Sequence, residues 1–216
     1  MGFVDYLTTP SNIEALVEQG IEHITLTGAA ILTATVLGML LGIVAHRLHF
    51  ARGPIMNVLS VLLTIPSLAF IALMIPLVGI GFRPAYIPLV AYALLPIGRN
   101  TLAGLRAVDP AVVESARGMG MGNLQRLWRM ELPVAWPIIL TGIRVATLLI
   151  VGVAAVAALV GGPGLGEELY LRGIRRIGSP GALEALLGGT LAVLIVALLF
   201  DLFYQLVGRF TISKGL

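Results

Sequence analysis

The sequence predicts an all-α, polytopic membrane protein. Of its 216 residues, 58% are hydrophobic and only 12% are charged, whereas soluble domains carry about 25% charged residues. The uncharged residues fall in long runs. The run Ile24–Ala45, built as a helix, rises about 33 Å and can cross a hydrocarbon core about 30 Å thick. Lipid satisfies no backbone polar group, and the runs lack the alternation of barrel strands, so helices are expected.

Five core transmembrane helices follow from these runs, at about 24–45, 54–79, 84–105, 133–159 and 183–208. The first run follows an acidic segment and precedes no small-residue cleavage pattern, so we expect a retained span and not a signal peptide. The predicted organisation is an external N-terminal segment 1–23, a transmembrane domain 24–209 with a cytoplasmic loop 106–132, and a cytoplasmic tail 210–216.

The distribution of basic residues predicts the orientation. The first 23 residues contain four acidic side chains and no Lys or Arg, whereas the loop 46–52 contains two arginines and two histidines. By the positive-inside rule, that loop is cytoplasmic and the N-terminus lies outside. The arginine-bearing loop 106–132 and the C-terminus, with Arg209 and Lys214, then lie inside. The loop 161–180 disagrees, because Arg172, Arg175 and Arg176 fall on the predicted outer side, so its placement stays open.

The second span contains a proline in its middle, within Thr64-Ile65-Pro66-Ser67. Proline removes a helical hydrogen bond and clashes with the preceding turn. Carbonyls freed in this way are tolerated at membrane depth where they line a cavity or are buried in protein. The span is therefore either a kinked packing helix or two segments, which would raise the count to six. Thr64, Pro66 and Ser67 are candidate pathway residues.

The loop between the third and fourth spans has ordered helix signals. Asp109-Pro110 is typical of a helix start, with Asp as the N-cap and Pro at the first helical position. Gly118, Gly120 and Gly122 then interrupt the helix. We expect Asn123 to cap a second short helix, Leu124–Met130, before Pro133 opens the fourth span. Two short helices around a glycine elbow form a compact knob on which another protein docks.

The same loop resembles the EAA loop of type I binding-protein-dependent ABC importer permeases. The family pattern is Glu-Ala-Ala, three residues, Gly, nine residues, Ile-x-Leu-Pro. This sequence has Glu114-Ser115-Ala116, then Gly120, then Met130-Glu131-Leu132-Pro133 at the same spacing. The departures are Ser115 for Ala and Met130 for Ile, both modest changes in size. The resemblance implies that Glu114, Ser115, Ala116, Gly120, Met130, Leu132 and Pro133 couple the chain to an ATPase.

Further stretches resemble the glycine betaine/choline/carnitine branch of these permeases, the importers of osmoprotectants. They are the runs 65–70, 95–101, 116–121 and 161–166. The resemblance implies a multi-pass protein of the bacterial cytoplasmic membrane, paired with a second permease copy or a paralogue. It also implies a cytoplasmic ABC ATPase dimer and an extracytoplasmic substrate-binding protein, which we expect to be a separate polypeptide. Rocking of the spans between inward- and outward-facing states would move the solute.

The sequence itself also indicates that a partner subunit, and not this chain, binds ATP. The sequence contains no phosphate-binding loop of the GxxxxGK[ST] type, so we expect no nucleotide site and no cofactor in this chain, with ATP and Mg bound by the partner ATPase. Carriers driven by protons or sodium usually need ionisable groups at membrane depth. Here these are few, namely Arg99, Arg144 and Asp201. Enzymatic activity is not expected, because no convergent Asp, His, Ser or Glu groups occur in the spans.

Arg144 and Asp201 lie at similar depth in the fourth and fifth spans. An isolated charge there is costly, so we expect a structural ion pair, with a pathway role as the alternative. Cysteine is absent, and the three histidines have no accompanying ligand cluster, so no metal site is expected. The aromatic residues of the spans do not cluster as a quaternary ammonium cage would require, which places substrate recognition in the binding protein. We expect no nucleic-acid partner and contact with membrane lipid.

Other functions stay open at this point. A permease for another small solute, such as methionine or another amino acid, would have the same loop. A passive channel would leave the knob unexplained. The sequence does not identify the solute, the pathway-lining residues, or whether the permease dimer is homomeric or heteromeric.

Overall fold

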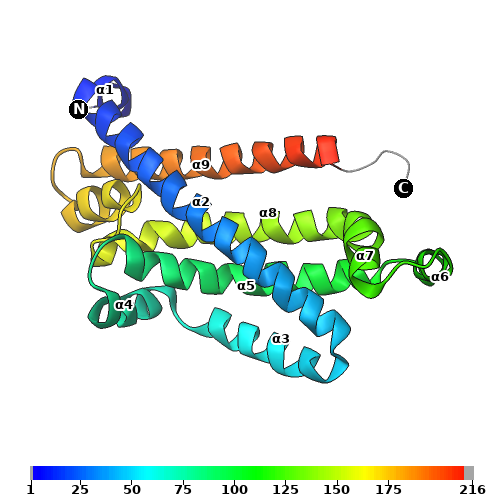
Figure 1. The fold of residues 1–216 in the computed structure, drawn as a ribbon. Coiled ribbons are helices and arrows are strands. Elements are labelled where there is room, and N and C mark those ends of the chain that lie inside the picture. Colours follow the sequence, from blue (N-terminus) through cyan, green and yellow to red (C-terminus); the bar gives the residue numbers. More distant parts are fainter. Residues whose placement is uncertain (1, 212–216) are drawn as a thin grey trace.

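The computed structural model describes residues 2–211, which are mostly helical and include no strand. After the short helix α1 (Phe3–Thr8), helix α2 runs unbroken from Pro10 to Arg47. It begins well before Ile24, because Pro10 is favourable in the first turn of a helix and no later residue interrupts it. The uncharged run Ile24–Ala45 is therefore the apolar part of a longer helix. Figure 1 shows α2 crossing the bundle diagonally from one end to the other.

The second span is broken. Helix α3 (His49–Thr64) and helix α4 (Ser67–Val78) meet at an angle of 95° across Ile65 and Pro66. The Tyr92 hydroxyl donates a hydrogen bond of 2.7 Å to the carbonyl oxygen of Ile65, which satisfies a backbone acceptor that the break exposes. Of the two structures open for this span, two segments and not one kinked helix are observed.

The core of the bundle is α5 (Phe82–Arg106), which packs between α2 and α8 (Leu132–Val156). Glycines allow these close approaches. A Cβ atom at Gly42 of α2 would lie 2.8 Å from the carbonyl oxygen of Gly98, and one at Gly142 of α8 would lie 2.9 Å from that of Pro96. Small residues that bring backbones together are typical of helix packing in membranes. The small residue Gly142 thus serves a contact within the chain.

The last long helix, α9 (Ala182–Thr211), packs along α8. Between them, the segment 161–180 forms helical turns, η3 (Glu167–Gly173) and η4 (Ile174–Arg176), after the turn η2 (Ala157–Val160). Glu168 of η3 is fully buried, beside the Tyr6 hydroxyl, Gln19 and Arg172. The loop 161–180, whose side of the membrane the charge distribution left open, is thus held against α1, α2 and α9. The predicted position of Lys214 lies outside the described residues.

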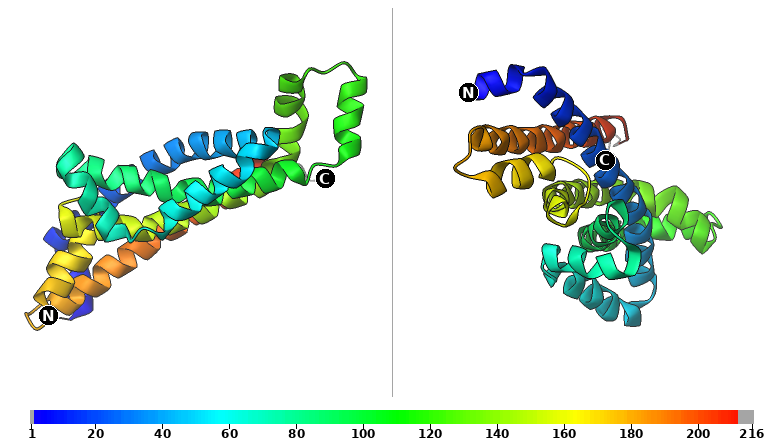
Figure 2. Two further views of the ribbon diagram at one scale, coloured as in Figure 1. Left: turned by 90° about the horizontal axis from the view of Figure 1, so that it is seen from below. Right: turned by 90° about the vertical axis from the view of Figure 1, so that its left-hand side faces the viewer.

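Three helical stretches in residues 2–211 are long and apolar enough to cross a membrane: Pro10–Arg47, Asn123–Val160 and Ala182–Thr211. The bent pair α3–α4 adds a fourth if it counts as one span. Helix α5 is 25 residues long but carries Arg83, Arg99 and Arg106. The chain is therefore an all-α, multi-pass membrane protein. Figure 2 shows that the long helices run along the same general direction and that a small helical knob stands off one end.

Candidate functional site

The knob begins with α6 (Pro110–Gly118). The Asp109 side chain accepts a hydrogen bond of 2.8 Å from the backbone N–H of Ala111, so the predicted N-cap is confirmed. The helix ends at Gly118, and Gly120 adopts a φ of +77°, a left-handed conformation that glycine adopts without steric cost. The chain reverses here. In Figure 2, α6 and the following helical turns form two arms that project beyond the bundle.

The second arm differs from the prediction. Helix α7 (Asn123–Arg126) starts at Asn123, with Gly122 in the capping position and no side-chain cap bond. The predicted cap at Asn123 is therefore wrong: Gly122 is extended, and Asn123 already has helical geometry. The helix also does not stop at Met130. It continues through a π-helical turn, η1 (Leu127–Glu131), directly into α8, which starts at Leu132 and contains Pro133 in its first turn.

The predicted coupling residues divide into an exposed and a buried set. Glu114, Ser115, Gly120 and Pro133 are exposed, Met130 is partly buried, and Ala116 and Leu132 are buried. Apolar contacts hold both arms to the bundle, because Leu127 and Leu132 belong to the main apolar core and Val112 and Val113 of α6 pack against it. The exposed Glu114 and Ser115 are therefore presented on a helix that the bundle itself supports.

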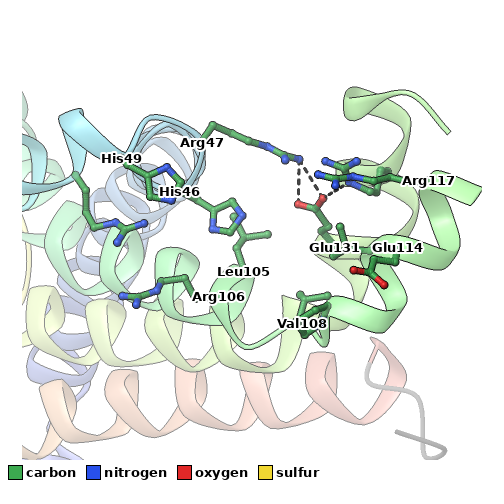
Figure 3. Close-up of a pocket in the computed structure, with 13 residues that line it drawn as sticks. His46, Arg47, His49, Leu105, Arg106, Val108, Glu114, Arg117 and Glu131 are labelled. Carbon is green, nitrogen blue, oxygen red and sulfur yellow. Dashed lines mark hydrogen bonds and ion pairs between the residues drawn. The ribbon is translucent and has the colours of Figure 1, made fainter.

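Sequence reasoning missed the carboxylate that fixes this arrangement, Glu131. It is 2% exposed and accepts hydrogen bonds from two arginines (Figure 3). Arg126 Nε lies 2.7 Å from its Oε1, and Arg47 Nη2 lies 3.2 Å from Oε1 and 3.0 Å from Oε2. Buried charges require such pairing. The family pattern leaves this position unspecified, and Arg47 lies 84 residues earlier in the chain, so no local signal could identify the pair.

A cavity of about 620 Å³ lies between α6 and the corner where α2 meets α3. Figure 3 shows His46, His49 and Arg106 on one side and Glu114 and Arg117 on the other. The lining is strongly basic, and Glu131 with its two arginines forms part of the wall. The knob and the end of the bundle thus enclose a charged space.

At membrane depth, Arg144 of α8 and Asp201 of α9 form a two-point ion pair. Arg144 Nε and Nη2 lie 2.5 Å and 2.9 Å from the two carboxylate oxygens, and Gln205 donates a third hydrogen bond at 2.8 Å. Arg144 and Gln205 line a cavity of about 290 Å³ between the two helices. Arg99, the other deep arginine, donates to the Ser60 hydroxyl at 2.9 Å.

The candidate pathway residues lie at the break between α3 and α4. Thr64 ends α3, Pro66 precedes α4, and Ser67 opens it. Thr64 and Pro66 are exposed, and Ser67 is partly buried. The Thr64 hydroxyl donates back to the carbonyl oxygen of Val61 at 2.7 Å, which offsets part of the hydrogen bonding lost at this helix end.

Residues 34–213 match the family described as binding-protein-dependent transport system inner membrane component. The chain belongs to this family. Relatives of this transport component include the choline transport system permease protein OpuBB of Bacillus subtilis, 37% identical over 83% of this chain and 81% of the relative. The osmoprotectant import permease protein OsmW of Salmonella typhimurium is 39% identical over 83% of this chain and 84% of that protein. The glycine betaine/carnitine/choline permease protein OpuCB of B. subtilis is 34% identical, over 90% and 88%.

Solved structures of other transporters share the fold of this transport component. A chain of the MetNI methionine ABC transporter, in an inward-facing conformation, superposes with a TM-score of 0.84 at 20% identity, over 95% of this chain and all of that one. A chain of an amino acid ABC transporter superposes with a TM-score of 0.75 at 18% identity, over 95% and 98%. The chain therefore has the fold of these ABC transporter chains over nearly its whole length.

Proposed function

We propose that this chain is the permease subunit of an ATP-driven importer of quaternary ammonium osmoprotectants such as glycine betaine, choline and carnitine. The observation that carries the proposal is the knob, in which buried residues support a helix whose Glu114 and Ser115 are exposed. The printed names of the relatives, which are choline, carnitine and osmoprotectant permeases, support the class of solute. The likeness to methionine and amino acid transporters, at about 20% identity, supports the fold alone.

In this proposal the knob lies in the cytosol and α6 docks on a partner ABC ATPase, which binds ATP and Mg. The proposed topology has five core spans, with α3 and α4 together as the second, an external N-terminus and a cytoplasmic C-terminus. The basic corner 46–52 then lies on the cytoplasmic side, as the positive-inside rule requires. A second permease, either another copy or a paralogue, completes the pathway, and an extracytoplasmic binding protein delivers the solute.

ATP-driven closure of the ATPase pair would move α6 and, through the continuous helix α7–η1–α8, the spans. Glu114 and Ser115 are assigned to the docking surface. Ala116, Met130, Leu132 and Pro133 are assigned to the support of that surface, and Gly120 to the reversal between the arms. Thr64, Pro66 and Ser67 are assigned to the pathway, because the break leaves backbone polar groups that a water-lined pathway can satisfy.

The test is uptake by proteoliposomes that contain the permease, its ATPase and its binding protein. We expect uptake of radiolabelled choline or glycine betaine that requires ATP inside the compartment holding the ATPase, with no uptake of methionine. Methionine uptake under the same conditions would reassign the solute. Uptake that persists with a hydrolysis-deficient ATPase would show a passive channel instead.

A further inference from the structure

The cavity beside α6 has an unusual excess of positive charge. Its lining includes five arginines, two histidines and two glutamates. One of the glutamates, Glu131, is already paired with Arg47 and Arg126. Among the residues that the structure describes, Arg52, Arg106 and Arg117 form no ion pair. The described part of the chain therefore contributes three unpaired guanidinium groups to this space and one unpaired carboxylate, Glu114.

The walls of the cavity come from two parts of the molecule. One wall is α6, through Pro110, Val113 and Glu114, and the other is the end of the bundle, through His49, Arg52 and Arg106. The cavity therefore lies directly beside α6, the helix on which the ATPase is proposed to dock. A volume of about 620 Å³ lies within the usual range of ligand pockets, about 300–1,000 Å³, and has room for several side chains.

We propose that the partner ATPase inserts an acidic segment into this cavity and that Arg52 and Arg106 bind its carboxylates. The inference rests on the proposed function, because it needs an ATPase docked on α6. The planar guanidinium group of arginine matches a carboxylate with two parallel hydrogen bonds. The charge of the lining favours an anionic occupant, because three unpaired guanidinium groups repel a further cation and an apolar segment would displace their water without replacing its hydrogen bonds.

Glu114 adds a constraint on orientation. It is the single unpaired carboxylate of the lining and stands on α6, opposite Arg106 (Figure 3). A matching surface must present a cation to Glu114 and carboxylates to the bundle side. Such a pattern of opposite charges fixes register and rejects wrong partners, because like charges placed together are unfavourable. The charge pattern of the cavity would thus fix the orientation of the docked ATPase about the axis of α6.

The experiment measures the affinity of the purified ATPase for the permease in nanodiscs of zwitterionic lipid, over a range of salt concentrations. The variants are the double variant Arg52→Gln/Arg106→Gln and the charge reversal Arg52→Glu/Arg106→Glu. The matched control is Arg129→Gln, because Arg129 is exposed on the same loop but lies outside the cavity. We expect the reversal to weaken binding roughly tenfold at low salt, the neutral variant to weaken it less, and the loss to shrink as salt screens the charges.

Each outcome is decisive. Wild-type affinity and salt dependence in the reversal variant would overturn the inference, as would an equal effect of Arg129→Gln. Unchanged ATPase affinity combined with a change in co-purified anionic phospholipid would assign the cavity to a lipid headgroup and overturn it too. Failure of the wild-type permease to bind the ATPase at all would instead contradict the proposed function. A monodisperse elution profile of each variant shows that loss of binding is not loss of folding.

Discussion

Arg47 and Glu131 join the C-terminal end of α2 to the base of the knob, with Arg47 Nη2 3.0 Å from one carboxylate oxygen of Glu131. Because Arg126 occupies the other side of the same carboxylate, one buried group ties α2, α7 and the π-helical turn together. At its other end, α2 holds the segment 161–173 through Glu22, which accepts a hydrogen bond of 3.0 Å from the N–H of Gly164. Helix α2 thus connects the knob physically to the opposite end of the bundle.

Replacing Glu131 by glutamine should uncouple transport from ATP hydrolysis. Glutamine keeps the size of the side chain but removes its charge, which leaves Arg126 buried without a counter-ion, at a cost of about 3–5 kcal/mol. We expect a lower thermal midpoint and fewer solute molecules transported per ATP hydrolysed. Glu167→Gln, at an exposed glutamate with no ion pair among the described residues, is the control. A normal transport-to-hydrolysis ratio in Glu131→Gln would refute the coupling role.

The pair of Arg144 and Asp201 predicts an unequal effect of single and double substitutions. Asp201→Asn leaves Arg144 unpaired at membrane depth, where an isolated charge is costly, so thermal stability in detergent should fall. The double variant Arg144→Gln/Asp201→Asn removes both charges and should recover much of the loss. If each single variant keeps normal expression, stability and transport, the pair has no structural role. Lost transport in a fully stable double variant would favour the pathway role instead.

Because α8 packs closely on α5, replacing a glycine of α8 by alanine should reduce stability only where that glycine faces α5. Gly142→Ala puts a methyl group 2.9 Å from the carbonyl oxygen of Pro96 and against Asn100, which should destabilise the protein by about 1–3 kcal/mol. Gly152→Ala on the same helix meets no atom within 4 Å and should be neutral or mildly stabilising. The measurement is the midpoint of thermal unfolding of each variant, followed with a fluorescent dye that does not depend on cysteine, because the chain has none. Equal midpoints would contradict the packing account.

The Tyr6 hydroxyl and Glu168 anchor α1 to the segment after α8. Burial, together with the hydrogen bond to Glu168, raises the pKa of Tyr6, so the hydroxyl stays protonated and donates at neutral pH. Tyr6→Phe leaves the buried carboxylate with one partner fewer, at a cost of about 1–3 kcal/mol. We expect faster proteolysis within residues 2–9 in the variant. Unchanged proteolysis would show that apolar contacts alone hold α1.

Much of the architecture follows from local patterns. The uncharged runs indicate the long helices, because apolar length is a property of adjacent residues, and Asp109-Pro110 marks the start of α6 for the same reason. The short helix Leu124–Met130 was predicted, but its π-helical turn over Leu127–Glu131 and its continuation into α8 were not. A π-helical turn has no sequence signal comparable to a cap or a proline. Asn123 was wrongly predicted as the N-cap, because Gly122 has the extended backbone of an N-cap residue and Asn123 is already helical.

The residues of the site that lie in one loop could be predicted from the sequence, whereas charge interactions between distant segments mostly could not. The match at Glu114 and Gly120 lies within one loop and could be read directly. Glu131 gains its role only when Arg47 arrives from another helix, and the basic cavity forms only when α6 folds back toward Arg52 and Arg106. Arg144 and Asp201 could be paired in advance because similar depth and the cost of isolated charge restrict the choice of partner.

The most direct test of the account measures ATPase binding and ATP-driven uptake by Glu114→Lys and Gly120→Leu in proteoliposomes. Leucine at Gly120 opposes the left-handed turn at φ +77° and should displace α6, while lysine at Glu114 reverses the exposed charge that α6 presents. We expect both variants to insert in the membrane, to lose most ATPase binding and to abolish uptake. Normal assembly and a normal rate of uptake in both would contradict the assignment of the knob as the site through which ATP hydrolysis drives transport.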